Sequence, residues 1–257
     1  MKVRCLSAFA ALLMFAGLPA YAADPADVWL AKARAYLGGE SALNAVDSLH
    51  FEGAVEATER VADPADSSKV IERPIRLAID IVFQKPMQQR QVIRSEKVER
   101  TTSLDGSDAW ERVSDRTNQN PPRIQLLDLT GIKRLRATTI ENLSFYSNLG
   151  HNMRQVRLLG DTTVDGIACV KLSFTHTSNI VFIRYFEKST GRLVKTELDS
   201  GGEIREQGEM MVSGIRFPRT VINKTADGKA TTISFDKVTV NERFPADTFA
   251  VPAIPTR

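Results

Sequence analysis

Few side chains in this sequence combine the type and the spacing that catalysis or metal binding requires. The three histidines, His50, His151 and His176, are far apart, and none stands at ligand spacing from another histidine or a cysteine. Asp161 and Asp165 flank a turn signal, which explains both carboxylates without catalysis. No phosphate-binding loop, nucleophile elbow or paired-histidine zinc helix is present. We therefore expect a non-enzymatic protein with no metal and no cofactor, whose histidines make ordinary hydrogen bonds.

The first 22 residues have the pattern of a cleavable export signal. Lys2 and Arg4 precede an apolar run over 5–18, and small residues at 20 and 22 complete a cleavage site. We expect the mature chain to begin at Ala23 and to reside in the periplasm. Stable membrane insertion is not expected, because no other run is long and apolar enough to span a bilayer. Loss of the leader lowers the formal net charge by two, from +3 to +1, which leaves no basic footprint for nucleic acid.

Cleavage also leaves Cys169 as the only cysteine, so no internal disulfide can form. The segment GIACVKLSF around it alternates as a strand does, and a free cysteine in a strand is usually a small packed hydrophobe. A nucleophilic role would need a lowered thiol pKa and a neighbouring base. We expect stability to come from burial of apolar side chains within one domain over 23–257.

The start of the mature chain predicts two short helices and then a strand. Leu30, Ala33 and Leu37 recur at helical spacing before a pair of glycines, and a second helical turn begins near Glu40. Over 49–57 the period becomes two, which indicates a strand with one apolar face. Two small helices therefore precede the sheet.

The middle of the chain predicts further strands and one longer helix. Alternation is clearest over 75–83, and a second strand is expected from about 90 to 103, before a hairpin at Asp105-Gly106. The polar segments 59–73 and 116–122 both contain proline, and we expect them to be loops.

An apolar stripe at helical spacing follows, and predicts an amphipathic helix from about Leu129 to Leu149. The remainder predicts a meander of antiparallel strands, because turn signals recur between apolar alternating segments. These signals are Asp165-Gly166, Ser189-Thr190-Gly191, Gly201-Gly202, Ser213-Gly214 and Asp227-Gly228. A large curved sheet with half-apolar strands must have one face covered, so we interpret the helices as its lid or plug.

Aromatic residues on the strand faces leave two interpretations open. Phe51, Phe83, Phe174, Tyr185 and Phe235 join many Ile, Leu and Val residues beneath the helices. They either interdigitate into a dry core at native packing density, or line an apolar cavity for acyl chains or another lipid. The second interpretation requires a sheet that curves around more volume than the helices occupy.

Several segments, taken in order, resemble the LolA/LppX-like superfamily of periplasmic lipoprotein carriers. The stretch ARAYLGGESALNAVDSLHFEG is similar to the N-terminal helix and first strand of its outer membrane lipoprotein-sorting subfamily. Four later stretches resemble its C-terminal strands: VRLLGDTTVDGIACVKLSF, IRYFEKSTGRLVKTE, MVSGIRFPRTV and VTVNERFPADTFAVP. The chain departs from the small carriers by its greater length, and no single position matches the arginine that locks their lid.

The resemblance implies a mainly β protein with α-helices: an unclosed antiparallel β-barrel, or half-barrel, with helices over a hydrophobic cavity. It also implies a carrier that holds acyl chains of lipoproteins or another lipid without covalent chemistry. We expect one domain of about eleven strands, with lipid as the ligand. Related half-barrels sense envelope stress, so an interaction module that binds envelope proteins without lipid is the alternative. The residues expected to face the cavity are Phe51, Ile79, Phe83, Leu135, Leu143, Phe174, Tyr185 and Phe235.

Overall fold

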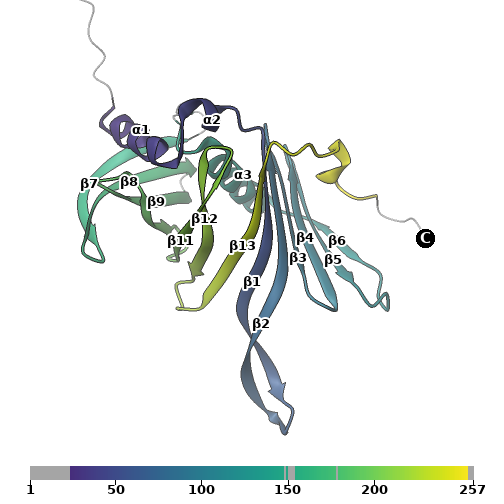
Figure 1. Cartoon of the computed structure of the whole chain (residues 1–257). Coiled ribbons are helices and arrows are strands. Elements are labelled where there is room, and N and C mark those ends of the chain that lie inside the picture. The colour runs from purple at the N-terminus through teal and green to yellow at the C-terminus, as the bar shows by residue number, and fades with distance from the viewer. Residues whose placement is uncertain (1–23, 148, 150–153, 178, 254–257) are drawn as a thin grey trace, which may run out of the picture.

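One antiparallel sheet of 13 strands dominates the computed structural model, which describes residues 24–147, 149, 154–177 and 179–253. The strand order is β6-β5-β4-β3-β2-β1-β13-β12-β11-β10-β9-β8-β7. The first and last strands of the chain therefore pair at the middle of the sheet, and each half of the chain extends to its own edge (Figure 1). Within the described residues β6 and β7 do not pair, so the barrel is unclosed. The expected fold class is confirmed, with thirteen strands where about eleven were expected.

Six strands form the first half of the sheet. The segment expected as one strand over 90–103 forms two strands, because a turn at 95–97 divides it. In this turn the Ser95 hydroxyl oxygen accepts hydrogen bonds from the backbone N–H groups of Lys97 and Val98. The expected hairpin at Asp105-Gly106 is confirmed. The strands are β1 (Ser48–Asp63), β2 (Asp66–Gln84), β3 (Gln88–Arg94), β4 (Val98–Asp105), β5 (Asp108–Asp115) and β6 (Arg123–Leu126).

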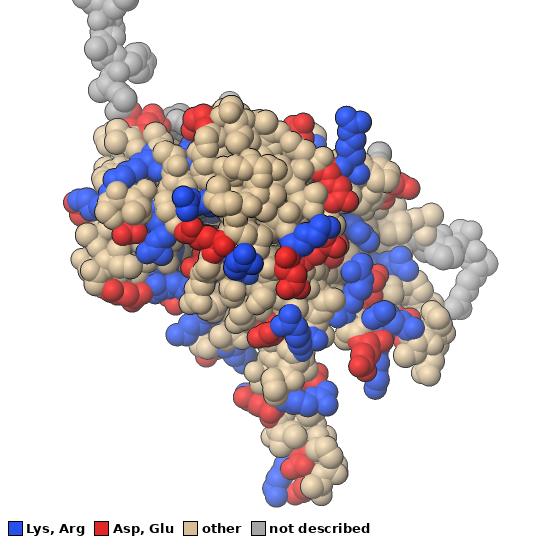
Figure 2. Space-filling model, in the orientation of Figure 1, with Lys and Arg blue, Asp and Glu red and all other residues tan. Residues whose placement is uncertain are grey.

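The prediction of a loop over 59–73 is wrong, because β1 and β2 continue through it as a two-stranded ribbon that projects beyond the sheet (Figure 1). Its cross-strand pairs include two ion pairs, Glu59 with Arg73 and Arg60 with Glu72, and such opposite-charge pairs stabilise a ladder modestly. Figure 2 shows charges of both signs along the ribbon and over the face in view. Both faces of the ribbon meet solvent, so its polar sequence does not alternate as a half-buried strand would.

Seven strands form the second half, and all five turn signals of the predicted meander separate consecutive strands. Asp165 and Ser213, with positive φ of 51° in both cases, stand in two of these turns, each followed by a glycine that also has positive φ. The strands are β7 (Gln155–Val164), β8 (Ile167–Thr177), β9 (Ile180–Glu187), β10 (Leu193–Leu198), β11 (Glu203–Val212), β12 (Ile215–Lys224) and β13 (Ala230–Val240).

The three predicted helices are α1 (Pro25–Leu37), α2 (Glu40–Asn44) and α3 (Leu129–Ser144), and a 3-10 turn covers Ala246–Thr248. Asp24 and Asp128 cap α1 and α3, since their carboxylates accept the backbone N–H groups of Ala26 and Gly131. The third helix ends before the expected Leu149, because Phe145 and the residue after it adopt left-handed conformations.

The helices cover the concave side of the sheet. Leu43 of α2 and Leu143 of α3 pack in one cluster with residues of β1, β2, β12 and β13. Leu30 of α1 packs in a second cluster with residues of β8 and β9. A smaller cluster contains Cys169, which is fully buried, as expected of a packed hydrophobe.

Gly53 allows the two central strands to approach closely. The pairing of β1 with β13 shifts register between Glu52 and Gly53, and a Cβ atom on Gly53 would stand 2.0 Å from the backbone oxygen of Ser234. We expect Gly53→Ala to lower the free energy of unfolding by about 1–3 kcal/mol, because backbone must move to admit the methyl group.

The measurement is thermal unfolding, in which about 1 kcal/mol lowers Tm by roughly 2–4 °C for a domain of this size. Gly39→Ala is the control, since no atom lies within 4 Å of a Cβ at that position. Equal Tm values for the two variants would contradict a close approach of the strands at Gly53.

Candidate functional site

A cavity of about 450 Å³ lies between α3 and the concave face of the sheet. This volume falls within the range of about 300–1,000 Å³ that small-molecule sites occupy. Side chains of β1, β2, β3, β9, β10, β11, β12 and β13 contribute to its wall. The apolar lining includes Leu49, Phe51, Ile81, Phe83, Phe217, Val221, Ile233 and Phe235. The sheet therefore encloses more space than its helices fill.

Four phenylalanines form the apolar wall at the middle of the sheet. The Phe51 ring lies 6.2 Å from that of Phe83 and 5.8 Å from that of Phe217, with edge-to-face geometry in both cases. The Phe235 ring is 5.0 Å from Phe51 and tilted against it. Aromatic pairs in these arrangements hold one another in place, so this wall is preformed.

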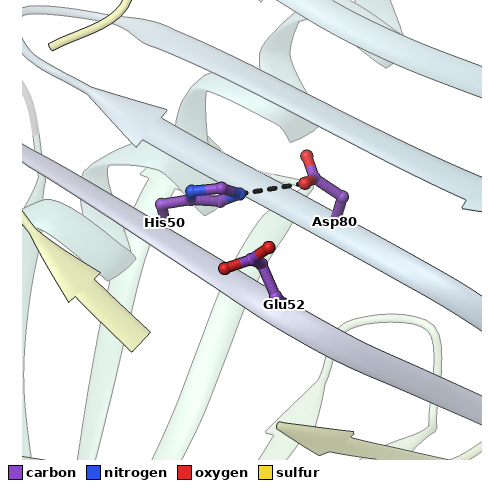
Figure 3. Close-up of side chains that lie close together, drawn as sticks. All are labelled: His50, Glu52 and Asp80. Atoms are coloured by element: carbon purple, nitrogen blue, oxygen red, sulfur yellow. Dashed lines mark hydrogen bonds and ion pairs between the residues drawn. The ribbon is translucent and has the colours of Figure 1, made fainter. Parts of the chain in front are cut away.

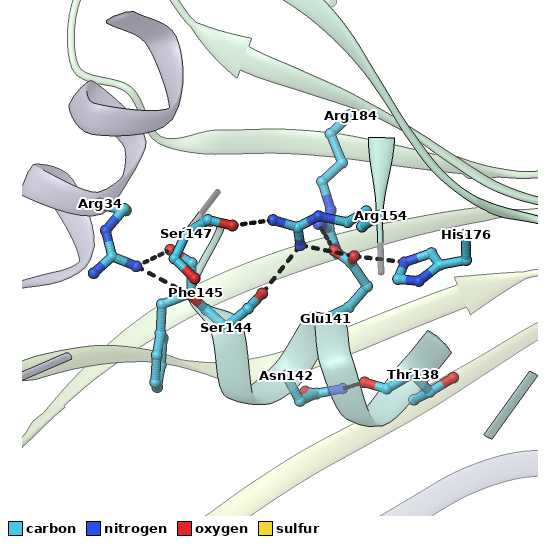
Figure 4. A network of polar contacts seen from close by, with 10 residues as sticks. All are labelled: Arg34, Thr138, Glu141, Asn142, Ser144, Phe145, Ser147, Arg154, His176 and Arg184. Carbon is cyan, nitrogen blue, oxygen red and sulfur yellow. Dashed lines mark hydrogen bonds and ion pairs between the residues drawn. The ribbon is translucent and has the colours of Figure 1, made fainter. Parts of the chain in front are cut away.

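A buried polar network lies at the other side of the cavity, formed by Glu141 of α3 with Arg154, His176 and Arg184 (Figure 4). The Arg154 Nη1 and the His176 Nε2 lie 2.9 and 2.7 Å from Oε1 of Glu141. Arg184, from β9, donates to the other carboxylate oxygen. The network joins the covering helix to the far half of the sheet.

Cationic partners and aromatic rings compensate the burial of these charges. Burial alone would raise the pKa of Glu141, but the charges of Arg184 and Arg154 and the hydrogen bond with His176 hold it well below its ordinary value. The Arg184 guanidinium also lies 4.6 Å from the centre of the Phe174 ring. A carboxylate with so low a pKa is a weak base, so this network is poorly suited to proton abstraction.

Arg34 fastens α1 to the end of α3. Its Nη1 donates to the backbone oxygens of Ser144 and Phe145 over 2.9 and 2.8 Å, and its Nε and Nη2 bond both carboxylate oxygens of Glu40 in α2 (Figure 4 shows the bonds to α3). One side chain therefore holds all three helices together.

Three of the eight residues expected to face the cavity, Phe51, Phe83 and Phe235, lie in its wall. Ile79 and Leu143 are buried in the same hydrophobic cluster without being part of the wall. The other three lie elsewhere: Leu135 packs near β4 and β5, Phe174 packs under α1, and Tyr185 belongs to the cluster of Cys169. Ligand binding by these residues stays a prediction.

Tyr185 faces away from the cavity because its neighbour in the strand, Arg184, faces into it. Residues 182 and 184 line the cavity, so the intervening residue and Tyr185 lie on the other face of β9. An arginine in a strand is normally expected to face solvent, and that expectation favours the opposite parity. No local signal marks Arg184 as inward, because its partner Glu141 stands 43 residues away in the sequence.

A second polar cluster surrounds His50 on the opposite face of β1 (Figure 3). The His50 Nε2 lies 2.9 Å from Asp80 of β2, and its Nδ1 lies 2.7 Å from Glu242, which follows β13. The hydrogen bond with Asp80 has the largest effect on the pKa of His50, and it raises that pKa. Burial lowers the pKa, but the two carboxylates together raise it to about 9. The imidazolium therefore ties two strands and the C-terminal segment together.

His50, Glu52 and Asp80 are also residue types that could hold a metal ion, since their ligand atoms lie within 4.8 Å of one another. Both ring nitrogens of His50 already contact carboxylates, and Glu52 accepts a hydrogen bond from Lys237 over 2.7 Å. The arrangement is that of an ion-pair cluster. His151, the remaining histidine, lies outside the described residues.

The sheet, its helices and the cavity define a class of protein: an open antiparallel half-barrel with an apolar hollow beneath covering helices. Within that class, the chain has the fold of LolA superfamily proteins and of outer membrane lipoprotein-sorting domains. In the described part of the chain no helix is long and apolar enough to cross a membrane.

Three solved structures share this fold at low sequence identity. A LolA superfamily protein from Nitrosomonas europaea matches with a TM-score of 0.57 and 14% identity, covering 88% of this chain and 97% of its own. A putative outer membrane lipoprotein-sorting protein domain from Vibrio parahaemolyticus matches with a TM-score of 0.53 and 9% identity. The match covers 87% of this chain and 97% of that domain. A DUF1329 family protein from Desulfovibrio piger matches with a TM-score of 0.52 and 15% identity. The match covers 88% of this chain and 98% of that protein. No protein-family model matches the sequence, and a comparison with curated proteins gives no match.

We expect Glu141→Gln to destabilise the protein by about 3–5 kcal/mol, because it leaves two buried guanidinium groups without their shared anion. Denaturant unfolding measures the change. Asp199→Asn is the control, since Asp199 pairs over 2.6 Å with Arg134, which is half-exposed. Loss of such a pair should lower the free energy of unfolding by about 0–1 kcal/mol. A loss below about 1 kcal/mol for Glu141→Gln would show that the network does not hold α3.

The His50 cluster predicts a loss of stability at alkaline pH. The folded pKa of about 9 exceeds the unfolded value of about 6.5, so the stabilisation is complete below pH ~6.5 and disappears as the pH rises through ~9. We expect the difference in unfolding free energy between wild type and His50→Gln to shrink by about 1–2 kcal/mol between pH 6 and pH 10, allowing for the partial exposure of Glu242. A constant difference over that range would exclude the charged imidazole.

Proposed function

We propose that the mature chain, over 23–257, is a periplasmic, non-enzymatic carrier that holds acyl chains of lipoproteins or another lipid-like ligand in the cavity. The observation that carries the proposal is the cavity itself, which has apolar walls and remains after the helices have packed on the sheet. The fold shared with LolA superfamily and lipoprotein-sorting structures supports it. The leader expected over 1–22, which lies outside the described residues, supports export.

Burial of an acyl chain supplies the binding energy in this proposal. Each methylene removed from water contributes about 0.8 kcal/mol, so several of them give useful affinity without any covalent bond. Release requires those methylenes to be exposed again. Opening of α1 and α2 would do this, and it would break the bonds of Arg34 to the end of α3.

The chemistry of the side chains supports a role without catalysis. Burial raises the pKa of the Cys169 thiol, which makes it a poor nucleophile, and Cys169 belongs to a different cluster from the cavity. The Glu141 carboxylate is a weak base for the reason given above. Neither group favours a hydrolase.

A second candidate is an interaction module, for which the projecting ribbon is the specific observation. Val70 is 67% exposed and Ile71 is 38% exposed near its tip, so two adjacent aliphatic side chains are open to a partner there. An envelope protein that docks there would be held without lipid. Removal of the tip would abolish such binding and leave lipid retention unchanged.

Native mass spectrometry tests the carrier proposal on the mature protein purified without detergent. We expect wild type to retain lipid and Ile233→Trp to lose most of it, because Ile233 lines the cavity and an indole would occupy the space. Thr232→Trp is the matched control, since Thr232 lies next along β13 and on the opposite face, across from Glu56. A wild-type protein that carries no lipid, or equal loss in both variants, would refute the proposal.

A further inference from the structure

The cavity has two chemically different ends. Phenylalanines from β1, β12 and β13 line one of them. Arg184 of β9 and Glu206 of β11 line the other, and the strand order separates β9 from β1 by four strands. Apolar side chains such as Phe182 and Ile204 also line the second end, but a purely hydrocarbon ligand would leave Arg184 and Glu206 without polar partners.

Arg184 has hydrogen-bonding capacity that the described residues do not use. A guanidinium group carries five N–H donors, and the only hydrogen bond of this one within the described residues is from Nη1 to Glu141. Its Nε is buried without a partner, and the side chain is only 9% exposed. The Nη2 donors make no hydrogen bond within the described residues either, and Arg184 lines the cavity, so the end at β9 favours a ligand that accepts hydrogen bonds.

The charge at this end favours an anion. Two guanidinium groups, those of Arg154 and Arg184, share the single carboxylate of Glu141. Glu206 is the other carboxyl group nearby, and it has no hydrogen-bond partner among the described residues. Burial raises its pKa, and the charge of Arg184 offsets that only in part. A raised pKa favours the protonated form of Glu206, and protonation would leave one positive charge uncompensated.

We propose, on the basis of the carrier function above, that the cavity binds a single-chain amphiphile with an anionic head, which Arg184 holds while the chain lies among the phenylalanines. The head is a carboxylate or a phosphate, since the oxygens of both accept charge-assisted hydrogen bonds from a guanidinium group. Glu206 lines the same end of the cavity and faces the head. The polar and apolar ends of the ligand thus match the two ends of the cavity.

Calorimetric titration of the delipidated mature protein at fixed salt tests this proposal with three probes of equal chain length. Dodecanoate and dodecyl phosphate carry the two anionic heads, and dodecan-1-ol is the uncharged control. We expect at least one anion to bind about 10-fold or more tightly than the alcohol, because hydrogen bonds to charged groups are stronger than neutral ones. The tighter anion identifies the head.

Equal affinity for the anions and the alcohol would overturn the anionic-head proposal and leave the carrier function standing. Failure of all three probes to bind would overturn both. The comparison uses the wild-type protein, so it stands even if a variant does not fold.

Variants locate the anion. Arg184→Met should lower the preference for the anion over the alcohol by about 10-fold. The ratio of the two affinities is compared, because Arg184 also belongs to the network that holds α3. Arg134→Met is the matched control, because Arg134 also lines the cavity but pairs with Asp199 and is 48% exposed. Glu206→Gln, which places a neutral donor at this position, should not lower the preference. A preference that survives in Arg184→Met would overturn the assignment.

Discussion

The shared carboxylate of Glu141 fixes the position of α3, and the cavity exists because α3 stays where it is. Removing charged groups from water costs several kcal/mol for each ion, and here Glu141 meets that cost only by contacting Arg154, His176 and Arg184 together. Moving α3 away from the sheet would separate buried charges from their partners. The helix is therefore a permanent strut between the two halves of the sheet, and a movable lid has to be sought elsewhere.

The first two helices are better suited to movement. Arg34 attaches them to α3 through hydrogen bonds to two backbone oxygens, and its carboxylate partner, Glu40, has a side chain that is 62% exposed. Opening at this point would let water solvate the guanidinium, so the charge would not remain buried and unpaired. Such movement would also expose the side chains of Leu30 and Leu43, which are buried in the two main hydrophobic clusters.

Local signals in the sequence predicted the turns, the three helices and the alternation of β1 and β2, because glycine-bearing turns and apolar periodicity depend on near neighbours. The predictions that failed concern residues whose conformation depends on partners far away in the sequence, or that have no packing partner at all. The ribbon over 59–73 has no core to impose alternation on it, so its sequence resembles a loop. Arg184 faces inward because of a helix residue 43 positions earlier, and no rule of spacing connects those two residues. The part of the cavity wall around Arg184 was consequently out of reach of the sequence.

The same inward arginine explains why the hollow is not simply filled with larger apolar side chains. A dry core would place hydrocarbon against the Glu206 carboxyl and the remaining N–H donors of Arg184, and burying polar groups without partners is costly. At the phenylalanine end no such obstacle exists, and there the rings do pack on one another at 5.0–6.2 Å. Under the anionic-head proposal, the polar group of the ligand would supply the partner that the side chains at this end lack.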